Sequence, residues 1–153
     1  MRVFKFGGAS VKDADGIKNV YDVLQKVGYE DVLLVVSAMG KTTNALEDVI
    51  KNYFEKSEEL NSSVQEVKKY HNQILLDLFE DEKKQVFAAV NSLFSELEYF
   101  LAHNKSPNYN FVYDQIVSYG ELISTTILSH FMNFMGIKTQ WLDVRNFIKT
   151  DNN

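Results

Sequence analysis

The sequence contains no cysteine, and only one of its 153 residues is proline. Without cysteine there can be no disulfide framework, no thiolate metal site and no cysteine nucleophile. The three histidines, His71, His103 and His130, have a spacing that fits no metal-binding motif, so we expect no metal site built by the chain itself. The absence of cysteine agrees with a reducing compartment, and we expect the protein in the cytoplasm.

Long apolar runs and clusters of like charge are also absent. No run approaches the roughly 18 apolar residues of a membrane span, and residues 1–6 lack the long apolar stretch of a signal peptide. The net charge is −5, from 16 basic and 21 acidic side chains, and no basic cluster could line a groove for nucleic acid. We therefore expect neither a membrane nor a nucleic acid as a partner.

The beginning of the chain has the pattern of a strand, a turn and a helix. Residues 2–6 are apolar and β-prone, and they stop at Gly7-Gly8. Apolar residues then recur with helical spacing from position 17 to 27, and Gly28 ends the predicted helix. A capping-box pattern at Ser10 places the start of this helix directly after the glycine pair.

Two further runs are predicted to be strands. Residues 32–36 are continuously apolar, which is typical of a strand covered on both faces in a parallel sheet. Residues 137–142 have the composition of a third strand. The order of strands and helices indicates an α/β fold with a mainly parallel sheet.

Between these strands the sequence predicts a helical section. Asn44 has the pattern of a helix N-cap, and apolar spacing predicts helices over residues 64–78 and 86–100, separated by an acidic turn at 80–82. The longest predicted helix covers about residues 111–135. We find no internal repeat or flexible linker in the sequence.

The first candidate site is the glycine turn with Lys5, Gly7, Gly8 and Ser10. Glycines let backbone amides approach an anion, and the helix that follows points its positive end at the same place. Lys5, at the carboxyl end of its strand, could neutralise a phosphate. The alternative is an ordinary tight turn with a surface lysine. The turn is neither a P-loop nor a dinucleotide fingerprint, because the required glycine spacings are missing.

The second candidate site is the polar loop of residues 37–44, which leaves the carboxyl end of the second strand. Ligands of open α/β sheets bind at that edge. The hydroxyls of Ser37 and Thr43, together with a helix amino terminus, could hold the carboxylate of a small acid. Thr43 could also serve only as part of a helix cap, and the two roles are compatible.

The third candidate is Glu121, which follows Gly120 in the long predicted helix and shares a face with apolar residues. A carboxylate there is costly if it is buried without a partner. It must either reach solvent or meet a cation such as a substrate ammonium group. Gly120 would allow another group to approach closely.

These three motifs together resemble the aspartate kinase family. They are Lys5-Phe6-Gly7-Gly8-Ala9-Ser10-Val11, Val35-Val36-Ser37-Ala38 with Thr43-Asn44, and Ser118-Tyr119-Gly120-Glu121. The resemblance spans nearly the whole chain. Ala9 departs from the family, in which a threonine is more usual at that position. Other amino acid kinases, which act on glutamate, acetylglutamate or uridylate, share the opening lysine and glycine pair but not the two later motifs.

The resemblance implies the amino acid kinase fold, an α/β/α sandwich, and transfer of the γ-phosphoryl group of ATP to the β-carboxylate of L-aspartate. Lys5 would be catalytic and, with Gly7, Gly8 and Ser10, would contact the nucleotide phosphates. Ser37, Thr43 and Glu121 would bind aspartate, with Glu121 pairing with its ammonium group. Magnesium would accompany ATP. Dimerisation is an expectation that comes from the family alone.

The family also carries a nucleotide-binding half and regulatory ACT domains, and neither is present in residues 1–153. We therefore expect a truncated piece, the amino-terminal portion of the kinase domain, that is inactive alone. The motifs do not separate a stand-alone aspartate kinase from one fused to homoserine dehydrogenase. A non-catalytic binding or assembly module, in which the glycine turn is merely structural, is the alternative of a different class.

Overall fold

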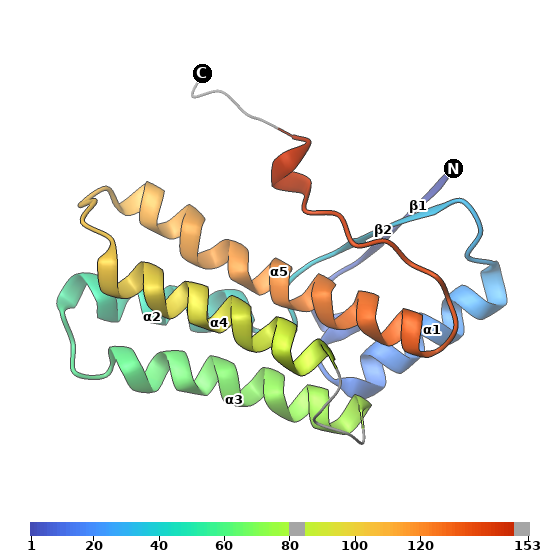
Figure 1. Cartoon of the computed structure of the whole chain (residues 1–153), viewed down its shortest axis with the longest axis horizontal. Coiled ribbons are helices and arrows are strands. Elements are labelled where there is room, and N and C mark those ends of the chain that lie inside the picture. The colour runs from blue at the N-terminus through green and yellow to red at the C-terminus, as the bar shows by residue number, and fades with distance from the viewer. Residues whose placement is uncertain (80–84, 149–153) are drawn as a thin grey trace.

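The chain was analysed as a computed structural model, which describes residues 1–79 and 85–148. It opens with strand β1 (Arg2–Phe6), the short 3-10 helix η1 (Gly8–Val11), helix α1 (Ala14–Val27) and strand β2 (Val32–Val36). The two strands pair in parallel, with Phe4 opposite Leu34 and Phe6 opposite Val36. Figure 1 shows this β-α-β unit at one end of the molecule. The predicted α/β fold with a parallel sheet is confirmed.

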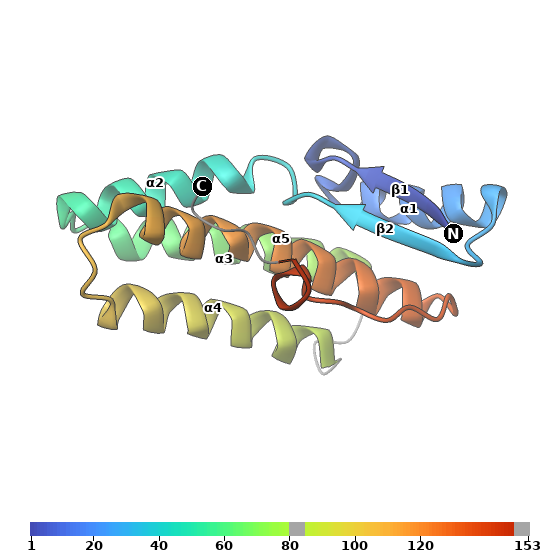
Figure 2. The ribbon, with the colours of Figure 1, turned by 90° about the horizontal axis from the view of Figure 1, so that it is seen from above.

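The helical section follows as α2 (Thr42–Glu55), α3 (Leu60–Leu78), α4 (Gln85–His103) and α5 (Tyr109–Phe134). These helices lie side by side (Figures 1 and 2), and the helices predicted over 64–78, 86–100 and 111–135 are confirmed. The predicted acidic turn at 80–82 lies outside the described residues. No helix in the described part of the chain is long and apolar enough to cross a membrane.

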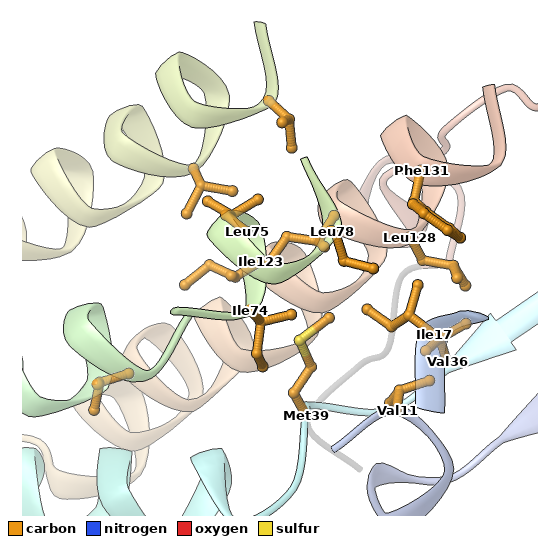
Figure 3. Close-up of a cluster of buried hydrophobic side chains, with 14 of the residues drawn as sticks. Val11, Ile17, Val36, Met39, Ile74, Leu75, Leu78, Ile123, Leu128 and Phe131 are labelled. Carbon is orange, nitrogen blue, oxygen red and sulfur yellow. The ribbon is translucent and has the colours of Figure 1, made fainter. Parts of the chain in front are cut away.

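One hydrophobic core joins the sheet to the helices. Figure 3 shows Ile17 of α1, Val36 of β2 and Leu128 of α5 around a common centre, with Met39 from the loop after β2. Ile17 and Met39 are completely buried. The loop that carries Met39 is therefore anchored in the core through Ala38 and Met39, while Gly40 remains exposed.

The sheet is covered by the described residues on one face only. Alternate side chains of a strand point to opposite faces, and Phe4 and Leu34 pack against the core. On the other face Val3, Leu33 and Val35 remain 57%, 42% and 43% exposed. The prediction that β2 is covered on both faces is therefore wrong for the described structure, because no described helix packs on the second face.

Two predicted helix caps were also misplaced. Asp13, not Ser10, caps α1, because its side chain accepts a hydrogen bond of 2.8 Å from the Gly16 amide, while Ser10 lies inside η1. Helix α2 begins at Thr42, so Asn44 lies within its first turn. Gly28 ends α1 as predicted, with a φ of 82°.

The predicted third strand at residues 137–142 is wrong. This segment has no strand partner in the two-stranded sheet of the described residues, and side-chain hydrogen bonds hold it against α5 instead. The Thr139 amide donates to the Asn133 side chain at 3.0 Å, and the Trp141 indole donates to the Thr125 hydroxyl at 2.9 Å. A β-prone run becomes a strand only where it can pair with another edge. The short 3-10 helix η2 (Val144–Asn146) follows.

Candidate active site

The glycine turn after β1 and the loop after β2 are in direct backbone contact. The Gly40 amide donates a hydrogen bond of 3.0 Å to the Gly8 carbonyl. A Cβ atom on Gly8 would lie 2.7 Å from the Ala38 carbonyl oxygen, which is closer than a side chain tolerates. Glycine at position 8 is therefore what allows the two loops to meet.

Helix α5 contacts the same loop through the third motif. The Ala38 amide donates to the Glu121 carboxylate at 3.3 Å, and the Ser124 hydroxyl donates to the Ser37 carbonyl at 2.8 Å. A Cβ atom on Gly120 would lie 2.8 Å from the Ala38 methyl group. The structure thus brings together the three motifs that the sequence analysis selected, although they lie far apart in the chain.

Lys5 and Gly7 border open space beside this meeting point. The Lys5 side chain is exposed, and it forms no hydrogen bond or ion pair with another described residue. A Cβ atom on Gly7 would meet nothing within 4 Å. Ser10, also exposed, closes the turn by donating its amide to the Gly7 carbonyl at 2.9 Å. Both the Lys5 side chain and the space at Gly7 are therefore open to an anion.

Ser37 and Thr43 lie on either side of the turn that starts α2, and both are half-buried. Ser37 extends the parallel pairing, since its amide donates to the Phe6 carbonyl at 3.1 Å. Neither side-chain hydroxyl hydrogen-bonds to another residue in the described ranges. Both hydroxyls, and the second oxygen of Glu121, therefore remain available to a polar ligand.

Sequence reasoning missed Thr42 and the part played by His71. Thr42 is 3% exposed, and its hydroxyl donates to the Met39 carbonyl at 2.6 Å. His71 of α3 is completely buried and lies 3.3 Å from that hydroxyl through Nε2. Burial lowers the pKa of His71 to about 4, so the ring is neutral at pH 7. His71 lies among the buried residues of α3, and no local signal in the sequence pointed to Thr42 as its partner.

The Amino acid kinase family profile matches residues 1–153, which is the entire sequence. Parallel pairing of β1 and β2, with the glycine turn and the polar loop at their carboxyl ends, places the site where α/β proteins bind ligands. The chain belongs to the amino acid kinase family.

The chain is similar in sequence to curated aspartokinases. The chain is 27% identical over 150 residues to the bifunctional aspartokinase/homoserine dehydrogenase 2 of Escherichia coli, covering 98% of this chain and 18% of that protein. It is 32% identical over 158 residues to the chloroplastic aspartokinase 1 of Arabidopsis thaliana, covering 97% of this chain and 26% of that protein. The resemblance predicted from the motifs is confirmed.

Solved structures agree with this fold. The crystal structure of E. coli aspartokinase III in complex with lysine and aspartate superposes with a TM-score of 0.82 at 26% identity, covering 99% of this chain and 33% of that one. The structure of the same enzyme with aspartate and ADP gives a TM-score of 0.84 at 24% identity, again with 99% and 33% coverage. The chain thus spans a third of that enzyme, with the same arrangement of elements.

Proposed function

We propose that this chain supplies the aspartate site and part of the phosphate site of an aspartate kinase, which transfers the γ-phosphoryl group of ATP to the β-carboxylate of L-aspartate. The observation that carries this proposal is the contact of the loop after β2 with both Gly8 and Glu121. This contact joins the glycine turn that follows Lys5 to the loop that carries Ser37 and to the half-buried Glu121 of α5.

The aspartate would lie between α5 and the loop after β2. The Glu121 carboxylate accepts from the Ala38 amide and would pair with the ammonium group of the aspartate. Ser37 and Thr43 would donate hydrogen bonds to the α-carboxylate of the aspartate. A charge-assisted pair of this kind is about twice as strong as a neutral hydrogen bond. The β-carboxylate would then point toward the open space at Gly7, where the phosphate is expected.

The phosphate side would be formed by Lys5 and the glycine turn. In the reaction a β-carboxylate oxygen forms a bond to the γ-phosphorus as the bond to the ADP oxygen breaks. Charge spreads over the equatorial oxygens of the transferred group, and catalysis consists largely of positioning and charge stabilisation. Lys5 would supply the positive charge that stabilises these oxygens. Gly7, Gly8 and Ser10 would leave room for the phosphates.

Magnesium would be bound chiefly through the nucleotide. The described residues contain no group of three His, Asp or Glu side chains that could hold a metal ion, and Mg²⁺ is commonly held by substrate phosphates with few protein ligands. When bound, it would neutralise charge on the phosphates. The residues described here are compatible with a metal that arrives with ATP.

The chain corresponds in this proposal to the amino-terminal portion of the kinase domain, and residues 1–153 alone would turn over poorly. A nucleotide-binding half would come from elsewhere in the complete protein. This chain is similar both to an aspartokinase fused to homoserine dehydrogenase and to an aspartokinase named without one. The proposal therefore suits a fused and a stand-alone aspartate kinase equally. A cytoplasmic location and a homodimer remain predictions.

Substitution of Lys5 tests the proposal in the protein expressed from its complete gene. Lys5→Ala should lower kcat for ATP-dependent aspartyl hydroxamate formation by about 10²- to 10³-fold, the effect of removing one transition-state donor. Lys18→Ala, which removes an exposed lysine of α1 paired with Asp15 at 3.7 Å, is the matched control and should leave kcat unchanged. An unchanged rate in Lys5→Ala would refute the role given to Lys5.

A further inference from the structure

Helix α3 contacts both ligand-binding loops, although neither loop belongs to it. Its contacts come from two neighbouring residues, Tyr70 and His71, whose rings meet edge to face with centroids 5.0 Å apart. Tyr70 is half-buried and His71 is completely buried. Both residues lie next to the loop after β2, Tyr70 at Gly40 and His71 at Thr42.

His71 faces the loop after β2. Its Nδ1 lies 2.8 Å from the Val67 carbonyl oxygen, and because a carbonyl only accepts, Nδ1 carries the proton of the neutral ring. Nε2 is then an acceptor, 3.3 Å from the Thr42 hydroxyl. That hydroxyl has a single proton and lies closer to the Met39 carbonyl oxygen, at 2.6 Å, so it donates there, and Nε2 is a second acceptor that competes for the same proton. His71 thus contacts the residue whose hydroxyl closes the turn of residues 39–42.

Tyr70 faces the glycine turn and the same loop at once. Its hydroxyl donates to the Lys12 carbonyl, directly after η1. A Cβ atom on Gly40 would lie 2.6 Å from this hydroxyl, and Gly40 has a φ of 53°. Tyr70 therefore touches the segment after the glycine turn and fills the space that a side chain at position 40 would need.

We propose that Tyr70 and His71 are positioning residues, which hold the glycine turn and the loop after β2 in the relation that phosphoryl transfer needs. His71 acts through Thr42 on the neighbouring Thr43, and Tyr70 acts through the Lys12 carbonyl on the glycine turn. This inference rests on the proposed function of the two loops. In this inference α3 supports the loops through Tyr70 and His71 and does not itself contact the substrate.

The test uses substitutions at both positions in the protein expressed from its complete gene. His71→Leu removes the acceptor and keeps an apolar side chain in the core, whereas His71→Gln restores an acceptor that can reach Thr42. We expect His71→Leu to lower kcat/KM for aspartate by about 10- to 100-fold, because small displacements of positioning groups have effects of this size. The KM for ATP should change little, and His71→Gln should recover most of the loss.

Tyr70→Phe removes only a hydroxyl and should instead raise the KM for ATP several-fold, by about 3- to 10-fold if one neutral hydrogen bond is lost. Tyr99→Phe, at a 66% exposed position of α4, is the matched control and should change no kinetic parameter. Kinetic constants of His71→Leu and Tyr70→Phe equal to those of the unsubstituted protein would overturn the inference.

Amide hydrogen exchange over residues 37–43 separates failure of this inference from failure of the proposed function. Faster exchange there in His71→Leu, reversed in His71→Gln, is expected whatever acceptor the enzyme phosphorylates. Unchanged exchange would overturn the positioning role. Faster exchange in a protein that phosphorylates no aspartate would leave the positioning role standing and refute the proposed function.

Discussion

The helical section and the loop cluster are built in opposite ways. Between α2 and α5 large apolar side chains fill the core, and Leu46, Leu75 and Phe94 are completely buried. Where the two loops and α5 meet, the elements approach closely at Gly8 and Gly120, which have no side chain. The first region supplies the free energy of folding, and the second supplies the geometry of the site. Substitutions in the two regions should therefore have different consequences.

The largest effect on stability is expected at Phe94. Truncating a buried phenylalanine to alanine costs about 3–5 kcal/mol, because transfer free energy is lost and a cavity remains. Phe94→Ala should therefore show this loss in urea unfolding. Because the Phe94 ring packs against that of His71, with centroids 6.0 Å apart, the folded variant should lose some kcat/KM for aspartate, but less than His71→Leu. Tyr99→Ala on the exposed side of the same helix should cost about 0.5 kcal/mol or less. A larger loss of kcat/KM in Phe94→Ala than in His71→Leu would contradict the distinction between the two regions.

Among the residues that make the loop contact, Gly8 should show the largest effect on activity alone. The added methyl group in Gly8→Ala would lie 2.7 Å from the Ala38 carbonyl oxygen, so the loops must separate. Misplacement by about 1 Å can cost about 10²-fold in rate, and steady-state kinetics should show a loss of that size. Gly7→Ala meets nothing within 4 Å and should match the parent in thermal unfolding. Full activity in Gly8→Ala would contradict the tight loop contact.

His71 lies at the boundary of the two regions and should make stability depend on pH. Its folded pKa is about 4 against an ordinary value of 6.5, so the unfolded chain binds more protons between these values and stability is lost as pH falls below 6.5. The loss between pH 7.5 and pH 5 should be about 2 kcal/mol, from 1.36 kcal/mol per pKa unit. Urea unfolding of the protein and of His71→Leu at both pH values measures it, and an equal loss in the variant would contradict the assignment.

Glu121→Gln should have a smaller effect than Gly8→Ala, confined to aspartate. Glutamine keeps an oxygen that can accept from the Ala38 amide, so the loop contact of 3.3 Å survives while the charge is lost. We expect the KM for aspartate to rise by about tenfold, which corresponds to about 1.4 kcal/mol for a charge-assisted hydrogen bond. Glu47→Gln, on α2 at the Tyr113 hydroxyl, is the control, and an equal rise there would point to a general charge effect.

Local patterns predicted most of the fold and selected three motifs that the structure brings together. The helices from α3 to α5 follow from apolar spacing, and the strands β1 and β2 from β-prone runs that end in glycine or polar residues. Residues 137–142 have the same composition, yet they pair with no strand, because pairing depends on an edge that sequence spacing does not reveal. The same limit explains why β2 was predicted to be covered on both faces, although no described helix packs on its second face.

The sequence suggested the residues of the candidate site but not the contacts that support them. Lys5 and Ser37 stood out because charge, hydroxyl groups and glycines gather at predicted strand ends, and Glu121 because a carboxylate follows a glycine on an apolar helix face. The bond between Thr42 and His71 joins residues 29 positions apart and depends on how α3 packs against α2. No periodicity encodes that contact, so only the structure could show it.

Formation of aspartyl phosphate by the protein expressed from its complete gene tests the central claim most directly. Hydroxylamine trapping with ATP and L-aspartate should give aspartyl hydroxamate at a rate that Glu121→Gln lowers when aspartate is limiting. Phosphorylation of glutamate, acetylglutamate or uridylate in place of aspartate, or no hydroxamate from a folded protein that binds ATP, would contradict the account.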